Sequence, residues 1–305
     1  MKKIRVGVVG VGHIGKNHAR LYAELPSAEF IAIYDTDRKI AEERAAEFGV
    51  RAVASLEEFA EQVDAASIAT PTSTHFQIGR ELLAKGKHLL VEKPIADNTA
   101  HASELAELAS SRGLVLQVGH VERFNPVLGA LEKRLTNPRF IEAHRLSPYP
   151  NRSTDIGVVL DLMIHDLEII LHLVNSPVQT IDAVGVPVLS RGEDIANARL
   201  RFENGCVANI TSSRISPEQM RKIRVFQGDM YLSLDYQNQS GEMYRRTAGS
   251  LTKEEVEIER EEPLKRQLAS FLECAATGRA PKVSGFQAAA ALELAVEITR
   301  RINPV

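Results

Sequence analysis

The strongest constraint on the fold is a regular alternation that extends over residues 4–118. Six short apolar segments, rich in β-branched residues, alternate with five segments whose apolar residues recur at helical spacing. The predicted strands are at residues 4–9, 30–34, 50–54, 65–70, 88–92 and 114–118. Strands that alternate with helices are typical of a parallel sheet covered on both faces. We therefore expect a doubly wound α/β domain at residues 1–119.

The pattern changes after Gly119, where strands begin to follow one another directly. The predicted elements are helices at about 126–136, 157–174, 263–277 and 285–302, and strands at 140–147, 180–189, 197–202, 206–213, 222–228 and 230–236. Asn204–Gly205, between two of these strands, is a hairpin signal. Successive strands indicate an antiparallel sheet. We expect an α+β domain with an open, mostly antiparallel sheet at residues 120–305, whose last helix can pack back on the first domain.

The composition indicates a globular protein without a large charge imbalance. Apolar residues make up 44% and charged residues 25% of the chain, and the formal net charge is −3. This charge gives no reason to expect nucleic acid or an anionic membrane surface as a partner, and no run approaches the ~18 apolar residues of a membrane span. Cys206 and Cys274 lie outside any paired spacing, which disfavours a disulfide framework or a metal site. We expect a cytoplasmic protein without a metal.

A glycine-rich loop, GVGHIG at residues 10–15, directly follows the first predicted strand and opens a helix. Gly10 permits a tight turn, Gly12 lets the backbone approach a pyrophosphate, and Gly15 allows close packing of helix and strand. The phosphates would lie at the helix N-terminus, where free N–H groups favour an anion. The expected cofactor-binding residues of this loop are Gly10, Gly12, His13, Ile14 and Gly15. The alternative is a glycine-rich turn without a ligand.

Asp35 strengthens the prediction of a dinucleotide site. It follows Gly15 by 20 positions and stands at the end of the second predicted strand, where a ribose-binding acid is expected. A carboxylate there would repel a 2′-phosphate, so NAD is favoured as the cofactor. Arg38 lies close enough in the sequence to leave NADP open.

Two further strand ends, ATPTSTH at residues 69–75 and VEKP at residues 91–94, place polar residues on the same predicted edge of the sheet. Ligands of parallel sheets bind beyond the carboxyl ends of the strands. The additional cofactor-binding candidates are Thr70, Pro71, Thr72, His75, Glu92 and Lys93. Taken alone, these residues fit equally well a helix cap, a surface loop and a lysine exposed at a strand end.

The segment VVLDLMIHDLEII at residues 158–170 is apolar almost throughout, yet it contains Asp161 and His165. Four positions apart on a helix, these two side chains lie on one face. A carboxylate and an imidazole in apolar surroundings are costly unless each has a partner. The pair is therefore a candidate catalytic pair, and the alternative is an ordinary structural hydrogen bond.

In this order and spacing, the motifs resemble those of the glucose–fructose oxidoreductase/inositol dehydrogenase/MocA-like (Gfo/Idh/MocA) family over essentially the whole chain. The segments that carry the resemblance are GVGHIG, the Asp35 region, ATPTSTH, VEKP and DLMIH with Asp166 following. The resemblance implies a Rossmann domain, an open-faced antiparallel sheet domain and a nicotinamide cofactor bound between them. It also implies a homodimer or homotetramer that associates through the sheet of the second domain.

The resemblance implies that Lys93 matches the lysine of the family's EKP motif, while Asp161 and His165 match its catalytic aspartate and histidine. The chemistry agrees with these roles. Oxidation of a secondary alcohol needs a base for the hydroxyl proton, and a neutral histidine suits that task. Asp161 could hold a substrate hydroxyl or orient the imidazole, and a lysine charge favours a developing alkoxide.

The substrate is expected to be a sugar, with a nucleotide sugar favoured. The segment GHVERFNP (119–126) resembles that of UDP-N-acetylglucosamine 3-dehydrogenases, which implies oxidation of the C3 hydroxyl, and HRLSPYPNR (144–152) supplies arginines suited to phosphate. The expected substrate-binding residues are Lys93, Arg123, Asn125, Arg145, Tyr149, Arg152, Asp161 and His165. For Arg123 the alternative is an interdomain salt bridge, with Phe124 as packing; for residues 144–152 it is a mobile surface loop.

Three other functions stay open at this point. The substrate could be a free polyol or sugar such as an inositol, which has less need of Arg145 and Arg152. A retained NAD could serve transient oxidation in non-redox chemistry, and a nucleotide-binding regulator would need no proton-transfer group. The chain also departs from the family pattern, because only Gly157 remains of the glycine-rich segment before the Asp161/His165 helix.

Overall fold

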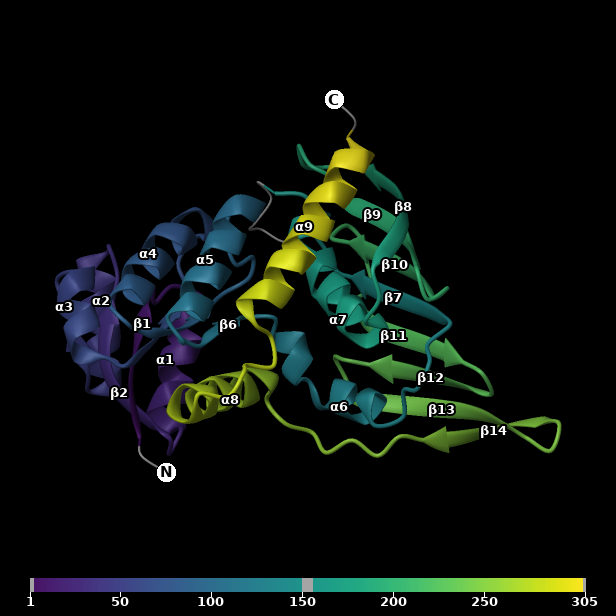
Figure 1. The fold of residues 1–305 in the computed structure, drawn as a ribbon, viewed down its shortest axis with the longest axis horizontal. Coiled ribbons are helices and arrows are strands. Elements are labelled where there is room, and N and C mark those ends of the chain that lie inside the picture. Colours follow the sequence, from purple (N-terminus) through teal and green to yellow (C-terminus); the bar gives the residue numbers. More distant parts are fainter. Residues whose placement is uncertain (1–2, 150–155, 304–305) are drawn as a thin grey trace. The chain divides into compact units, whose positions relative to one another are not determined.

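The computed structural model describes residues 3–149 and 156–303. Contacts divide the chain into two units (Figure 1). Unit 1 comprises Met1–Val121 and Glu262–Ala290, and unit 2 comprises Glu122–Glu261 and Ala291–Val305. The division between Val121 and Glu122 lies two residues beyond the boundary expected from the sequence. Residues 262–290, expected in the second domain, make their contacts in unit 1.

Unit 1 is built on a six-stranded sheet with the order β3-β2-β1-β4-β5-β6, and every pairing in it is parallel. Its strands are β1 (Ile4–Val9), β2 (Ala28–Tyr34), β3 (Arg51–Ala52), β4 (Ala65–Ile68), β5 (His88–Val91) and β6 (Leu116–Val118). The alternating helices are α1 (Gly15–Glu24), α2 (Arg38–Phe48), α3 (Leu56–Gln62), α4 (Thr72–Ala84) and α5 (Thr99–Ser111). The predicted doubly wound α/β fold is confirmed. The strand order reverses between β1 and β4, the switch point where ligands of such sheets bind.

Local sequence signals explain where these helices begin and end. Asp37 accepts hydrogen bonds from the N–H groups of Lys39 and Ile40 and so caps α2. Gly49 ends the same helix in the left-handed conformation, with φ of 67°. The predicted capping residue Ser55 accepts from the N–H of Glu58 at the start of α3.

Helix α8 (Pro263–Thr277) completes the core of unit 1 although it comes late in the chain. Leu268, Phe271 and Leu272 on its apolar face pack into the cluster that contains Val6 and Leu21. The driving force is burial of these side chains, worth about 1.5–3 kcal/mol for each fully buried large apolar residue. An amphipathic helix does not reveal in sequence which sheet it will cover, so the prediction could not assign α8 to its unit.

Unit 2 contains an eight-stranded sheet with the order β14-β13-β12-β11-β7-β10-β9-β8. Its strands are β7 (Phe140–Leu146), β8 (Val178–Val186), β9 (Ile195–Phe202), β10 (Val207–Ser213), β11 (Met220–Gln227), β12 (Met230–Asp235), β13 (Ser240–Thr247) and β14 (Ser250–Glu255). All pairings are antiparallel except that of β7 with β10, as the sequence predicted for a mostly antiparallel sheet.

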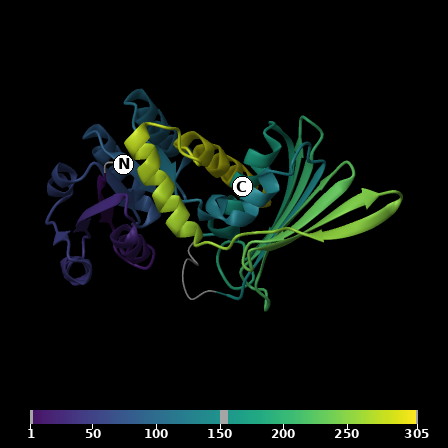
Figure 2. The same cartoon turned by 90° about the horizontal axis from the view of Figure 1, so that it is seen from below.

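One face of this sheet is covered and the other is open. The helical elements of this part of the chain are η1 (Val121–Phe124), α6 (Pro126–Glu132), the π-helical segment η2 (Val159–Met163), α7 (Ile164–Val174) and α9 (Gly285–Ile302), of which α9 begins within unit 1. Figure 2 shows α6 and α7 on one side of the sheet. Strand β7 alternates accordingly, with Ile141, Ala143 and Arg145 buried and the intervening residues half-buried.

The hairpin of β13 and β14 was not predicted from the sequence. All six residues of β14 are exposed, so it lacks the alternation of apolar and polar residues that identifies a half-buried strand. Ala248 and Gly249 join the two strands, both with positive φ, as a two-residue hairpin turn requires. Alanine is a poor signal for such a turn, which explains the omission.

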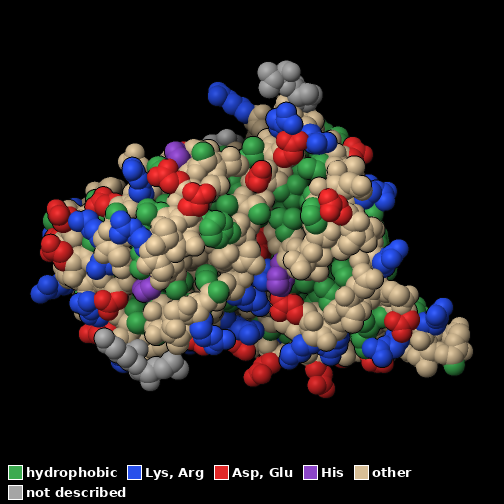
Figure 3. Space-filling model, in the orientation of Figure 1, with side chains coloured by type: hydrophobic (Ala, Val, Ile, Leu, Met, Phe, Trp, Pro, Cys, Tyr) green, Lys and Arg blue, Asp and Glu red, His purple; other side chains and the backbone are tan. Residues whose placement is uncertain are grey.

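The visible surface carries both signs of charge. Figure 3 shows acidic and basic side chains interspersed on the face in view. Within the described ranges, no helix combines the length and the hydropathy required to cross a bilayer.

Candidate functional site

The glycine loop after β1 has the backbone geometry that a dinucleotide requires. Gly10 has φ of +82°, and a Cβ there would lie 2.7 Å from Cγ2 of Thr70. A Cβ on Gly15 would overlap the carbonyl oxygen of Gly10, so neither position tolerates a side chain. At Gly12, by contrast, no protein atom lies within 4 Å of a Cβ position, and the space is open to a ligand. The residues present therefore fit the pyrophosphate of a dinucleotide.

Asp35 lies beside this loop, as the sequence predicted. Its Oδ2 accepts a hydrogen bond from the N–H of Val11 at 2.9 Å, and its Oδ1 accepts one from the N–H of Asp37 at 2.9 Å. These bonds hold the carboxylate at the end of β2 next to the end of β1. A negative charge fixed at this place suits a ribose diol and disfavours a 2′-phosphate.

Replacing Asp35 with alanine is expected to narrow the preference for NADH over NADPH. Loss of a hydrogen bond to a charged group costs about 1.5–3 kcal/mol, so binding of NADH should weaken about 10- to 100-fold while NADPH loses a repulsive neighbour. Fluorescence titration of both cofactors measures the ratio. Asp37→Ala is the matched control, because it removes the same charge two residues away and should leave the ratio nearly unchanged. An unaltered ratio in Asp35→Ala would contradict the assigned role.

His75 links the two other strand ends that the sequence singled out. Its Nε2 lies 2.9 Å from the carbonyl oxygen of Thr70, and its Nδ1 lies 2.9 Å from that of Pro94. Burial lowers the pKa of His75 and outweighs the opposing effect of the two carbonyl groups. Both ring nitrogens face the protein itself, so His75 supports the loop geometry and has no ring nitrogen left for a cofactor. Thr72 and Pro71 stand at the start of α4, at the same strand end.

Glu92 of the VEKP turn contacts helix α1. Its carboxylate oxygen Oε1 lies 3.2 Å from Nε2 of His18, a fully buried side chain on α1. A Cβ on Gly119 would lie 2.5 Å from Oε1 of Glu92, so the carboxylate fills the space that this glycine leaves. Lys93, half-buried, comes next in the chain. Sequence reasoning missed His18 as the partner of Glu92; a histidine on the apolar face of α1 was the available signal.

Asp161 and His165 lie at the beginning of the long helix of unit 2, but not within one regular α-helix. Asp161 belongs to the π-helical segment η2, and His165 to the first turn of α7. The N–H of Ile164 reaches back to the carbonyl oxygen of Val159, the i→i+5 bond of a π-turn. Both side chains are half-buried, whereas Met163 and Ile164 between them are buried. The two polar residues are thus the less buried members of this stretch.

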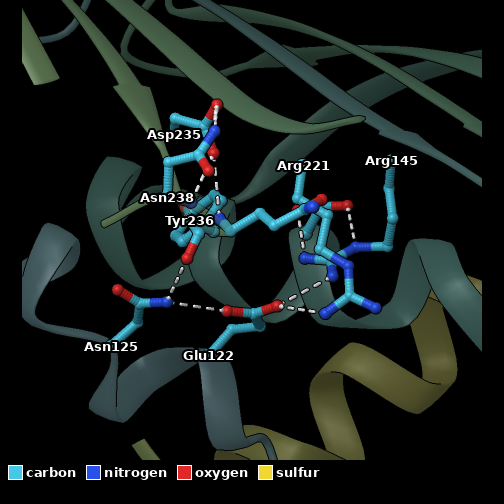
Figure 4. Close-up of polar contacts among 9 residues, drawn as sticks. Glu122, Asn125, Arg145, Arg221, Asp235, Tyr236 and Asn238 are labelled. Atoms are coloured by element: carbon cyan, nitrogen blue, oxygen red, sulfur yellow. Dashed lines mark hydrogen bonds and ion pairs between the residues drawn. The ribbon is translucent and has the colours of Figure 1, made fainter. Parts of the chain in front are cut away.

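The guanidinium of Arg145 is bound by two carboxylates. Its Nε and Nη2 bind the two carboxylate oxygens of Asp166 at 2.9 and 3.0 Å, and its Nη1 binds Glu122 at 3.0 Å. Figure 4 shows Arg145, Arg221 and Asn125 converging on Glu122. The guanidinium is buried, and its neighbouring carboxylates outweigh that burial and raise its pKa. The expectation that Arg145 binds a substrate phosphate has no support in this geometry, because each of its three guanidinium nitrogens already donates to a carboxylate of unit 2.

Arg123 and Asn125 are committed to the interior of unit 2 in the same way. Arg123 pairs with Glu168 at 2.8 Å, and both side chains are buried. Asn125 caps α6 by accepting from the N–H of Val127, and it donates to the carbonyl oxygen of Tyr236. The alternative prediction for Arg123 was a salt bridge between the two domains. The observed salt bridge, with Glu168, lies within unit 2. The observed partners of both side chains therefore belong to unit 2 itself.

The remaining predicted residues lie on the segment before the helix that contains Asp161 and His165. Tyr149 is exposed, and its hydroxyl lies 2.8 Å from Oγ of Ser190. Arg152 lies outside the described residues. The structure therefore provides a dinucleotide cradle in unit 1 and a half-buried candidate pair, Asp161 and His165, in unit 2.

Comparison with known proteins agrees with these two features. Residues 4–120 match the model of the oxidoreductase family with an NAD-binding Rossmann fold (GFO_IDH_MocA), and residues 131–229 match the Gfo/Idh/MocA C-terminal domain. The chain is 36% identical to a UDP-N-acetylglucosamine 3-dehydrogenase of Acidithiobacillus ferrooxidans, over 98% of this chain and 97% of that one. It is 24% identical to a scyllo-inositol 2-dehydrogenase (NAD⁺) of Bacillus subtilis, over 97% and 93% of the two chains.

Solved structures show the same likeness. The structure of the UDP-N-acetylglucosamine 3-dehydrogenase GnnA of Acidithiobacillus ferrooxidans superposes with a TM-score of 0.95, covering 99% of this chain and 98% of that one at 36% identity. A levoglucosan dehydrogenase in complex with NADH and levoglucosan shares the fold, with a TM-score of 0.90 at 16% identity and coverage of 99% and 97%. The two family models and these full-length matches show that the chain belongs to the Gfo/Idh/MocA family of NAD-binding oxidoreductases.

Proposed function

We propose that this protein is an NAD-dependent dehydrogenase that oxidises the C3 hydroxyl of UDP-N-acetylglucosamine or a closely related nucleotide sugar. The observation that carries the proposal is the match to the UDP-N-acetylglucosamine 3-dehydrogenase over nearly the full length of both chains, in sequence and in structure. A likeness that extends across both units includes the substrate domain as well as the cofactor domain.

The residues at the switch point of unit 1 would hold the cofactor. Gly10, Gly12 and the N-terminus of α1 would hold the pyrophosphate, since they combine open space with free N–H groups. Asp35 would bind the adenosine ribose. His13, Ile14, Thr70, Pro71 and Thr72 would complete the surface around the cofactor. When bound, NAD supplies a hydride acceptor.

The proton chemistry would belong to Lys93, Asp161 and His165. His165 would take the proton of the substrate hydroxyl as general base, a role for which imidazole is suited near neutral pH. Asp161, beside it on the π-helical segment, would hold the neighbouring substrate hydroxyl or orient the imidazole. The positive charge of Lys93 would stabilise negative charge that develops on the reacting oxygen.

The protein is further proposed to form a homodimer or homotetramer through the open face of the sheet in unit 2. Four half-buried aromatic rings cross this face on neighbouring strands, at centroid distances of 5.6, 5.0 and 4.5 Å: Phe140, Phe226, Tyr231 and Tyr244. Aromatic residues at this degree of exposure are typical of interfaces.

A cytoplasmic location is proposed because the two cysteines are free thiols.

A substrate panel tests the proposed function. Purified protein with NAD is mixed separately with UDP-N-acetylglucosamine, other UDP-sugars, free N-acetylglucosamine and inositols, and NADH absorbance is followed. We expect reduction of NAD with UDP-N-acetylglucosamine and little with the free sugar or the inositols. Reduction by inositols alone would replace the proposal with a polyol dehydrogenase, the activity named for the Bacillus relative. Binding of nucleotide and NAD without any NADH would favour a regulator.

A further inference from the structure

Glu193 is a buried carboxylate to which the proposed chemistry assigns no role. It lies on the segment between β8 and β9, and only 3% of its surface is exposed. Glutamate is almost never buried to this degree unless it has partners. Its partners are found at the N-terminus of the helix that contains Asp161 and His165.

Glu193 satisfies the first N–H groups of that helix. Its Oε1 accepts a hydrogen bond from the N–H of Val159 at 3.2 Å, and its backbone oxygen accepts one from the N–H of Val158 at 2.9 Å. The first N–H groups of a helix have no partner within the helix, and a negative charge beside them is favourable. Glu193 thus caps the helix from a different segment of the chain.

Gly157 explains how the carboxylate reaches this position. A Cβ built on Gly157 would overlap the carboxylate of Glu193, with both oxygens and the carboxyl carbon too close for any contact. Gly192 approaches from the same side, since its own Cβ would lie 3.1 Å from the backbone nitrogen and Cα of Gly157. The carbonyl oxygen of Gly157 in turn accepts from the N–H of Asp161 at 3.1 Å. The single glycine before the helix is therefore the residue against which Glu193 packs.

The segment that presents Glu193 is itself fixed. The next residue, Asp194, accepts hydrogen bonds from the N–H groups of Val188, Leu189 and Ser190 and pairs with the buried Arg214 at 2.8 Å. Burial opposes ionisation of Asp194, but these bonds outweigh it and hold its pKa well below the usual range. Arg214 also donates to the carbonyl oxygen of Ile156 at 2.7 Å, directly before Gly157.

We propose that Glu193, packed against Gly157, is a positioning residue that fixes where the π-helical segment begins and so sets the placement of Asp161 relative to His165. The inference rests on the proposed function of these two residues. Asp161 follows Gly157 by one turn, so a shift at Gly157 is transmitted directly to its backbone. A misplacement of about 1 Å in a catalytic group can lower the rate about 100-fold.

The test is a double-mutant cycle between Gly157→Ala and Glu193→Ala, with Glu193→Gln as the conservative variant. For each variant, kcat, the KM of NAD and the free energy of unfolding are measured with the substrate that the wild type oxidises. Glu193→Ala is expected to lower kcat about 10- to 100-fold with the KM of NAD unchanged. Gly157→Ala should lower kcat at least as much, because the added methyl displaces the carboxylate.

The double variant shows whether Gly157 and Glu193 act through their mutual contact or affect kcat independently. Without the carboxylate the methyl of Ala at position 157 has room, so kcat of the double variant should be no lower than that of Glu193→Ala alone. Glu193→Gln keeps the shape and the accepting oxygen and should retain most of the activity. Additive losses in kcat would overturn the proposal, as would coupling seen in the unfolding free energy while kcat stays at the wild-type value.

The same cycle separates this inference from the proposed function. If the wild type oxidises no member of the panel, the proposed function fails. The packing of Glu193 against Gly157 is then tested by the free energies of unfolding of the two single variants and the double variant. Additive losses of stability would overturn this packing, and strong coupling between the two substitutions would support it.

Discussion

Replacing His165 with alanine is expected to lower kcat about 10²- to 10⁴-fold, the usual contribution of a general base. His165 is half-buried in the first turn of α7 and close in sequence to Asp161. Without it, the hydroxyl proton has no acceptor positioned by the helix. The dinucleotide cradle belongs to unit 1, so binding of NAD should be unchanged. Steady-state kinetics and a fluorescence titration with NADH measure the two quantities.

His172 provides the control for this variant. It lies on the same helix, half-exposed, and pairs with Glu132 at 3.0 Å. His172→Ala removes an imidazole of α7 without touching the candidate site, so turnover should stay close to that of the wild type. Normal turnover in His165→Ala would show that His165 is structural and would remove the base from the proposed mechanism.

Replacing Arg145 with alanine is expected to lower the free energy of unfolding by about 3–5 kcal/mol, the cost of breaking a buried ion pair by removing one partner. The variant leaves the carboxylates of Asp166 and Glu122 buried without their main counter-charge. Arg145 holds the pKa of Glu122 below its usual range against the effect of burial, so its loss favours protonation of Glu122. Urea denaturation followed by circular dichroism measures the change.

Arg221→Ala is the matched control, because Arg221 lies 3.5 Å from the same Glu122 but is 43% exposed. Its loss should cost less than about 1 kcal/mol, as for other exposed pairs. The comparison also decides between two roles for Arg145. If Arg145 bound the substrate, its replacement by alanine would raise the KM for the nucleotide sugar and leave the free energy of unfolding unchanged. That result would contradict the interpretation of Arg145 as part of a buried ion pair.

The fold could be predicted from the sequence because its signals are local and repeated. Six apolar segments that alternate with helices dictate a doubly wound sheet, and the loop at residues 10–15 occupies the end of β1 that such a sheet leaves for ligands. Asp35 was identified by its spacing from Gly15 and its place at the end of the second predicted strand, and it is found beside the loop. These features depend on residues close in sequence or on a simple period.

The features that were missed depend on contacts between distant segments. Arg145 and Asp166 are 21 positions apart, and an arginine near a candidate catalytic helix looks the same in sequence whether it binds phosphate or a buried carboxylate. A signal did exist, since Asp166 and Glu168 within an apolar helix require partners. The cap by Glu193 spans 34 positions, and the π-turn at Val159–Met163 has no sequence pattern of its own.

The most direct test of the proposed function follows the hydrogen on C3. UDP-N-acetylglucosamine that carries deuterium at C3 is incubated with the protein and NAD, and the reduced cofactor and the sugar are examined by mass spectrometry. We predict that the deuterium appears in the reduced nicotinamide and that the sugar becomes a 3-ketone. Reduced cofactor without deuterium, with the label retained in the sugar, would contradict oxidation at C3.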